Sequence, residues 1–257
     1  MPTSLYGSII VGPIHSRRLG ISLGVNLLPI DGKLCTFDCI YCECGYNSEH
    51  RGGKFSKKED VVRALNEKLH EMSDEGKPLD VITFAGNGEP TLHPDFPEII
   101  DATLALRDRF YPQAKVSVLS NSTRIDHPEV RAALLKVDNN ILKLDSAFQE
   151  KMELIDGPVH ADFTVDKLVD NLCLFNGNLI IQSMFLRGKH RGIIVDNTTD
   201  ADVKAWVELL KRIRPKQVMV YSLDRPTPEQ NLEKIEHEEL ERIAQQARDA
   251  GLYVTVA

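Results

Sequence analysis

The chain has 257 residues, 42% hydrophobic and 27% charged, which is typical of a folded soluble protein and not of a disordered polymer. Its net charge of -7 argues against a protein that binds nucleic acid over its whole surface. The longest early apolar run, Ile9 to Val11, is too short for a secretion signal or a membrane-spanning helix. A cytoplasmic protein is therefore expected.

Short apolar runs alternate along the chain with longer segments of helical period, as in repeated βα units around a parallel sheet. Strands are expected at 22–28, 80–85, 115–119, 141–144, 179–185 and 217–221, and a further one at 252–256. Helices are expected around 61–72, 99–106, 130–137, 165–172, 203–210 and 240–247. Ser56 and Glu59 have the spacing of a capping box, and Gly251 is placed to end the last helix. The pattern predicts one α/β domain over residues 1–257, a (β/α)6 partial TIM barrel, with an open doubly wound sheet as the alternative.

A cluster of cysteines follows the first expected strand. Cys35, Cys39 and Cys42 have the spacing C-x3-C-x2-C, and Cys44 lies two residues further on. Such crowding favours a metal or cluster site over a disulfide framework. Three thiolates can hold a four-iron cluster with one iron open, whereas structural zinc uses four closed ligands. A four-thiolate zinc site that includes Cys44 is the alternative, but C-x-C is not the usual zinc spacing, so Cys44 is expected to be a non-ligand neighbour.

A glycine-rich loop follows the second expected strand. Gly86 and Gly88 would let the backbone approach a ligand where a Cβ would collide, and Glu89 comes directly after them. An ordinary strand-to-helix turn is the alternative. His93 is either a general acid or base or, as we favour, a histidine packed in a proline-rich turn.

Polar residues also end the later strands, where the loops of a barrel carry its ligands. These residues are Ser120 and Asn121, then Lys143 and Asp145, then Gln182 and Ser183, with Arg187 and the segment 221–224 as further candidates. Caps of turns and helices, or salt bridges at the barrel mouth, would explain them equally well. Gln182 and Ser183 are expected to point into the barrel if Ile181 and Met184 pack outward. Trp206 and Cys173 are expected in the core.

The cysteine motif, with Tyr41 just before its last cysteine, and the segment 86–90 resemble the radical S-adenosylmethionine (SAM) superfamily. The resemblance implies a partial barrel of the radical SAM type, a 4Fe-4S cluster on the three cysteines, and bound SAM. It implies reductive cleavage of SAM to a 5'-deoxyadenosyl radical that abstracts hydrogen from a substrate. Tyr41 would lie beside the adenine, and Gly86, Gly88 and Glu89 would hold the amino group of SAM. The ribose or carboxylate would contact Ser120, Asn121, Lys143 and Asp145, and Gln182 would face SAM or substrate.

Longer segments resemble the wyosine-type tRNA-modifying branch of that superfamily. They are 16–20, 23–29, 86–94, 142–145 and 221–226. Enzymes of this branch carry a second cluster on upstream cysteines, but no cysteine precedes Cys35 here, so a single-cluster member with a different substrate is expected. Three functions stay open: an enzyme acting on a small molecule or nucleic acid, an activase of a partner protein, and a zinc-binding interaction module. Either enzyme would need an electron donor such as flavodoxin or ferredoxin.

Overall fold

The computed structural model describes residues 5–16, 18–47 and 53–257. Its main sheet has eight strands in the order β1-β2-β3-β4-β5-β6-β9-β11. β1 runs antiparallel to β2, and the other neighbouring pairs are parallel. The strands are β1 (Ile10–Ser16), β2 (Gly20–Val25), β3 (Val81–Phe84), β4 (Lys115–Ser120), β5 (Asn139–Lys143), β6 (Ile180–Met184), β9 (Gln217–Tyr221) and β11 (Val254–Val256).

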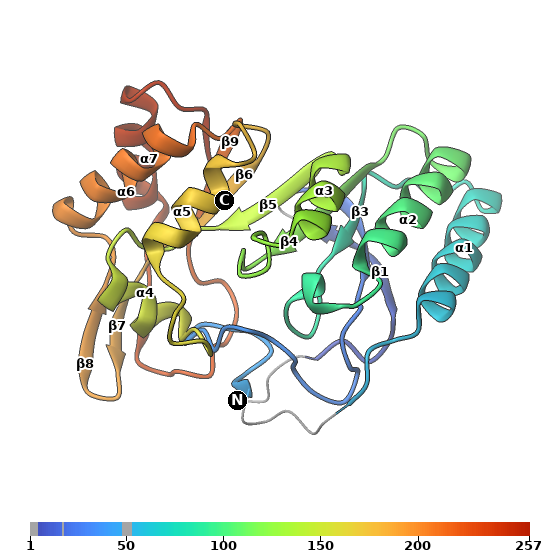
Figure 1. Cartoon of the computed structure of the whole chain (residues 1–257), viewed down its shortest axis with the longest axis horizontal. Helices are drawn as coiled ribbons and strands as arrows, with labels where there is room; N and C mark the ends of the chain where they lie inside the picture. Colours follow the sequence, from blue (N-terminus) through green and yellow to red (C-terminus); the bar gives the residue numbers. More distant parts are fainter. Residues whose placement is uncertain (1–4, 17, 48–52) are drawn as a thin grey trace.

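Helices connect the parallel strands. They are α1 (Lys58–Asp74), α2 (Phe96–Phe110), α3 (Pro128–Lys136), α4 (Gln149–Asp156), α5 (Val165–Cys173), α6 (Asp200–Ile213) and α7 (His237–Asp249), with the short 3-10 helix η2 (Pro90–Leu92). Figure 1 shows α1, α2 and α3 in succession at one end of the molecule and α5, α6 and α7 at the other. Their apolar stripes pack on the sheet, where they bury side chains such as Leu65, Leu134, Leu172 and Trp206.

The strand order decides between the two predicted architectures. From β2 onward each parallel strand is added beside the one before it, so the order never reverses as it does in a doubly wound sheet. No pairing joins β1 to β11 among the described residues, so the barrel stays open. The (β/α)6 partial TIM barrel is therefore confirmed, with β1 and β11 as added edge strands. All the strands expected from apolar runs are present.

Four strands of the described chain, β1, β7, β8 and β10, and the helix α4 were not expected from the sequence. A second sheet has the order β10-β7-β8 and is antiparallel, with β7 (Leu186–His190), β8 (Ile193–Asp196) and β10 (Leu232–Lys234). Figure 1 shows the β7–β8 hairpin projecting beside α4 at one corner of the molecule. The hairpin follows the carboxyl end of β6, so it is an insertion at that end of the barrel and does not change the order of the main strands.

Some local expectations were wrong. α1 begins at Lys58 with Lys57 as its N-cap and no side-chain cap, so Ser56 lies one residue too early for a capping box. Ser183 points to the helix layer, where its hydroxyl accepts a hydrogen bond from Trp206 Nε1 at 2.9 Å. Adjacent strand residues face opposite sides, so Gln182 and Met184 share the inner face, where Met184 packs with Tyr41. Trp206 is buried as expected, but Cys173 is only partly buried.

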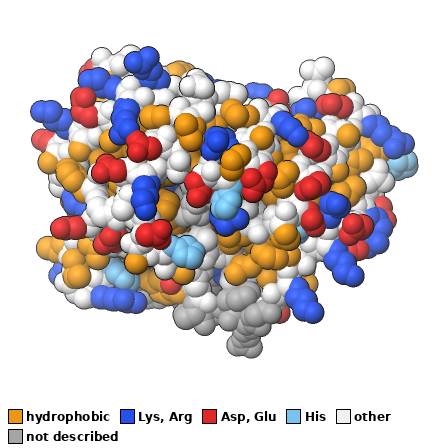
Figure 2. All heavy atoms as spheres, in the orientation of Figure 1, with side chains coloured by type: hydrophobic (Ala, Val, Ile, Leu, Met, Phe, Trp, Pro, Cys, Tyr) orange, Lys and Arg blue, Asp and Glu red, His pale blue; other side chains and the backbone are white. Residues whose placement is uncertain are grey.

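One further detail of the sequence interpretation, the end of the last helix, is confirmed. Gly251, at a φ of +86°, ends α7 by donating its backbone N–H to Arg248. Arg17, in the segment 16–20 that resembles the tRNA-modifying branch, lies outside the described residues. No helix of the described chain is long and apolar enough to cross a membrane. On the face drawn in Figure 2, Lys and Arg side chains alternate with Asp and Glu, as the moderate net charge suggests.

Candidate functional site

The cysteine loop connects β2 to α1 and is held from both sides by backbone hydrogen bonds. On one side Leu34 N donates to Asn87 O at 2.8 Å and Glu89 N donates to Leu34 O at 3.1 Å. On the other side Asp38 N donates to the carbonyl of Asp156 at 2.9 Å, at the end of α4. The loop is therefore fixed between the turn after β3 and the end of α4, across the carboxyl ends of the strands.

The glycines after β3 are needed for contact with the protein itself. A Cβ on Gly88 would lie 1.8 Å from Leu34 O, and Gly88 has a φ of +134°. A Cβ on Gly86 would lie 2.2 Å from Asn26 Oδ1. Contacts within the protein therefore already require glycine at both positions, and the expectation that these glycines also let the backbone approach a ligand stays a prediction.

Each thiol of the loop has its own environment. Asn121 Nδ2 donates to Cys35 Sγ at 3.4 Å, and burial raises the pKa of Cys35 to about 11. Cys39 lies between Lys143 Nζ at 3.7 Å and Asp156 Oδ1 at 3.6 Å, and burial raises its pKa. A hydrogen bond from the Cys44 thiol lowers the pKa of Cys42 to about 6.

The Cys44 thiol lies beside Cys42 and also contacts the turn after β3. Its thiol is buried and lies 3.4 Å from the carbonyl oxygen of Gly86, and burial together with the bond to Cys42 raises its pKa. All five cysteines are free thiols. Cys44 therefore has a packing partner of its own on the turn after β3.

The donor set fits a cluster better than a single metal ion. Within the described ranges, no three His, Cys, Asp or Glu side chains converge as one metal ion requires. The pKa values of Cys35 and Cys39 are each raised in part by the neighbouring thiols of the motif, so the three cysteines of the loop lie near one another. Thiolates of a four-iron cluster each bind a different iron and need not meet at one point.

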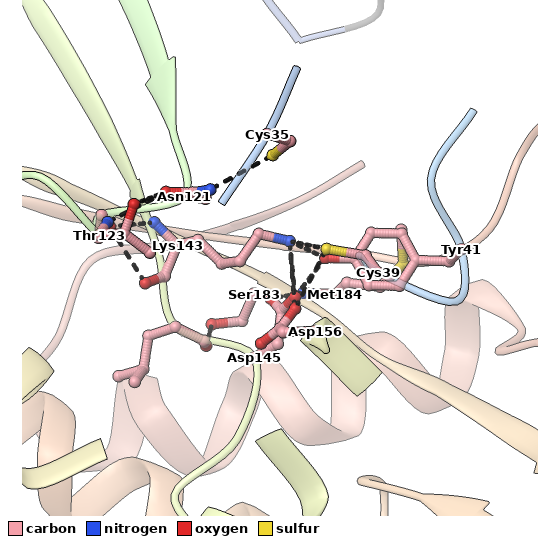
Figure 3. A network of polar contacts seen from close by, with 12 residues as sticks. Cys35, Cys39, Tyr41, Asn121, Thr123, Lys143, Asp145, Asp156, Ser183 and Met184 are labelled. Carbon is pink, nitrogen blue, oxygen red and sulfur yellow. Dashed lines mark hydrogen bonds and ion pairs between the residues drawn. The ribbon is translucent and has the colours of Figure 1, made fainter. Parts of the chain in front are cut away.

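A buried polar network lies beside Cys39 and includes three residues predicted from the sequence. Figure 3 shows the Lys143 side chain reaching from β5 toward Tyr41 and Cys39, with Asp145 and Asp156 beside its ammonium group. Lys143 Nζ lies 3.1 Å from Asp145 and 3.4 Å from Asp156, and it contacts the Tyr41 hydroxyl. Burial alone would lower the pKa of Lys143, but the neighbouring carboxylates raise it. The network thus keeps a cation and an aromatic ring together at the ends of β5 and the cysteine loop.

Glu89, after β3, is hydrogen-bonded to two other predicted residues, Ser120 and Asn121, at the end of β4. Its carboxylate accepts hydrogen bonds from Ser120 Oγ at 2.9 Å, Asn121 N at 2.6 Å and Thr91 N at 3.0 Å. Burial raises the pKa of Glu89, while these bonds act in the opposite direction. Ser120, Asn121 and Thr91 thus hold this carboxylate in place, and its Oε2 accepts only the bond from Asn121.

The remaining candidates divide into two groups. Gln182 is buried and pairs in register with Lys143, and Tyr221 at the end of β9 is close enough for Asp145 to raise its pKa, although burial is the larger cause. His93 packs in its turn, where Nε2 contacts Ser56 O and Nδ1 accepts from Asp95 N. Arg187 pairs with Glu239 and does not reach the cysteines.

Sequence reasoning missed two buried charged residues of the site. Lys33 is enclosed by the cysteine loop, and Asp156 closes α4 beside Cys39. Burial raises the pKa of Asp156 to about 8. Nothing in the sequence around them indicated burial, since Lys33 lies in a turn-like segment and Asp156 in a helix that was not predicted. The only signal for Lys33 was its place two residues before Cys35, and the sequence around Asp156 held no signal.

Comparisons with known proteins match this arrangement. Residues 30–172 match the family described as "Radical SAM superfamily". A "UPF0026 protein" of Helicobacter pylori is 31% identical over 224 residues, 85% of this chain and 67% of that protein. A similarly named protein of Methanocaldococcus jannaschii is 30% identical over 86% of this chain and 65% of its own length. The chain thus spans about two thirds of the length of these relatives.

Solved structures show the same fold at lower identity. A radical SAM methyltransferase from Sphaerobacter thermophilus superposes with a TM-score of 0.65 at 16% identity, over 92% of this chain and 65% of that one. TYW1 with a lysine-pyruvate adduct bound superposes with a TM-score of 0.62 at 16% identity, over 90% of this chain and 75% of that one. The family match confirms the resemblance seen in the cysteine motif. The chain belongs to the radical SAM superfamily and is an enzyme that uses a 4Fe-4S cluster and SAM.

Proposed function

We propose that Cys35, Cys39 and Cys42 hold one 4Fe-4S cluster and that the enzyme cleaves SAM reductively beside it. The observation that carries the proposal is the position of the cysteine loop. It brings Cys35 against Asn121 at the end of β4 and Cys39 against Lys143 at the end of β5. Ligands of α/β barrels bind at this edge, so SAM bound at the cluster would meet the polar strand ends.

The chain's own residues would bind and orient SAM. The cluster, once bound, supplies the electron that breaks the bond between sulfur and C5', which yields methionine and a 5'-deoxyadenosyl radical. Tyr41 would lie against the adenine, and Asp145 would accept hydrogen bonds from the ribose hydroxyls. The ammonium group of Lys143 would give up its contact with the Tyr41 hydroxyl and form a charge-assisted hydrogen bond with the carboxylate of SAM.

The loop after β3 would hold the other end of the methionine. Glu89 Oε1 already accepts from Ser120 and Thr91, but Oε2 accepts only from Asn121, so the backbone carbonyls of the Gly86–Gly88 segment and the remaining acceptor site of Glu89 would together hold the SAM amino group. Glu89 would also fix that backbone. Gln182 would face SAM or substrate from β6.

The radical would abstract hydrogen from a substrate that the sequence and the comparisons leave unnamed. A small molecule or a nucleic acid is the first candidate, and a partner protein that the enzyme activates is the alternative. A one-electron donor such as flavodoxin or ferredoxin would reduce the cluster. Superfamily membership favours either enzyme over a zinc-binding interaction module.

Anaerobic reconstitution with iron and sulfide tests the proposal without a substrate. The wild type should gain the visible absorbance of an iron-sulfur cluster and, with SAM and dithionite, release methionine and 5'-deoxyadenosine. Cys39→Ala should lose both signals, and Cys173→Ala, a cysteine on α5, is the matched control that should keep both. A colourless protein that binds one zinc per chain with equal loss in Cys44→Ala would contradict the proposal.

A further inference from the structure

Lys33 is a buried lysine that the proposed chemistry does not use. Its side chain is 1% exposed, although it lies in a loop. Its ammonium donates to Gly45 O at 2.9 Å and contacts Asp38 Oδ1 at 3.4 Å. Lysine is rarely buried in this way unless its charge is compensated.

The contacts of Lys33 place its charge inside the cysteine loop. Asp38 also accepts from Asn47 N at 2.7 Å, and Asn47 Nδ2 donates to the carbonyls of Cys35 at 3.2 Å and Phe37 at 3.1 Å. The loop from residue 33 to residue 47 therefore folds back on itself around one ammonium group. The three motif cysteines lie on this loop.

The protein neutralises this charge only in part. Lys143, the other buried lysine of the site, has two buried carboxylates within 3.4 Å. Lys33 has one ion-pair partner in the described part of the chain, Asp38, whose side chain is 35% exposed. Its other contact is the neutral carbonyl of Gly45, and the loop that encloses it carries the three motif cysteines.

We propose that Lys33 is a positioning residue for the cluster: a fixed buried cation that stabilises the three thiolates and the reduced state of the cluster that they bind. The inference rests on the proposed cluster at Cys35, Cys39 and Cys42. Three thiolates leave a four-iron cluster negatively charged, and one-electron reduction adds a further negative charge. A cation fixed nearby in a medium of low dielectric constant favours the more negative state. Lys33 therefore raises the reduction potential and brings the cluster within reach of its donor.

Three substitutions separate the charge from the hydrogen bond to Gly45. Lys33→Met removes both, Lys33→Gln keeps a donor without the charge, and Lys33→Arg keeps the charge. Lys204→Met, on the exposed side of α6, is the control. The reduction potential of each reconstituted protein is measured anaerobically by redox titration with EPR detection, in the absence of SAM. Iron content and circular dichroism report loading and folding.

The potential is expected to fall in Lys33→Gln and Lys33→Met and to stay at the wild-type value in Lys33→Arg and Lys204→Met. A wild-type potential in Lys33→Gln would overturn the inference, since a hydrogen bond would then suffice. If Lys33→Gln folds but loses iron to a chelator several-fold faster than wild type while Lys33→Arg does not, the charge stabilises the thiolates. Equal loss in Lys33→Arg would overturn the inference. A wild type that forms no 4Fe-4S cluster would instead contradict the proposed function.

Discussion

Gly88 offers a direct test of how the cysteine loop is held. Gly88→Ala adds a Cβ that would lie 1.8 Å from Leu34 O, at a φ of +134° that L-residues rarely adopt. The two backbone segments must separate to relieve this contact. Separation would stretch both hydrogen bonds that Leu34 makes, to Asn87 O and from Glu89 N. The cysteine loop would lose its attachment to the turn after β3.

The expected loss of stability follows from these contacts. The unfavourable backbone conformation costs about 1–3 kcal/mol, and two weakened backbone hydrogen bonds cost about 1 kcal/mol each. The total of about 4 kcal/mol is large against the roughly 5–15 kcal/mol that stabilises a domain. Gly76→Ala is the matched control, because Gly76 also has a positive φ, +64°, but no atom lies within 4 Å of the added Cβ. Its cost is about 1 kcal/mol.

Urea unfolding of the two apoproteins, followed by circular dichroism, measures the difference. Gly88→Ala should be about 3 kcal/mol less stable than Gly76→Ala, and it should retain less iron after reconstitution. Equal stabilities would refute the argument that Gly88 serves the contact with Leu34. If Gly88→Ala were stable and loaded but failed to bind SAM, the glycine would serve ligand approach, as the sequence first suggested.

Further substitutions test separate parts of the site. Cys39→Ala should abolish the visible absorbance of the reconstituted protein, whereas Cys44→Ala should keep it, and equal loss in both would support a closed four-thiolate site. Glu89→Gln should weaken SAM binding in an anaerobic titration while iron content stays unchanged, because Glu89 holds the turn proposed to receive SAM. Unchanged affinity would rule out this role for Glu89. Ser183→Ala should lower the free energy of unfolding by about 1–3 kcal/mol, because the indole N–H of Trp206 would lose its acceptor. SAM affinity should stay unchanged. Weaker SAM binding would indicate that Ser183 faces the inside of the barrel.

The sequence predicted the features that repeat along the chain. Buried parallel strands appear as short continuous apolar runs, and each is followed by a helix of clear period, so the barrel order could be read from the alternation. The polar residues at the strand ends could be predicted for a related reason. A parallel strand of known length fixes where its carboxyl end lies, and therefore placed Asn121, Lys143 and Asp145 near the cysteine loop.

Residues that depend on contacts across the fold were not predictable in this way. Asp156 reaches Cys39 only because the end of α4 hydrogen-bonds to the cysteine loop more than a hundred positions earlier. Lys33 is buried by a loop that closes over it, and a lysine is ordinarily expected at the surface. The side of β6 that faces inward was also ambiguous, since two polar neighbours, Gln182 and Ser183, cannot both point into the barrel.

The position of the cysteines limits this chain to one cluster. Cys44 is the only other cysteine near the motif, and it packs against Gly86 O, while Cys173 lies on α5 with its thiol 3.8 Å from Arg212 O. Two such separated thiols cannot supply a second set of three. Reconstituted protein should therefore contain about four irons per chain. With N1-methylguanosine tRNA, pyruvate, SAM and reductant it should form no tricyclic base, because the resembling tRNA-modifying enzymes use a second cluster. Eight irons per chain, or the tricyclic base in a cluster-dependent assay, would refute this prediction and make tRNA the leading substrate.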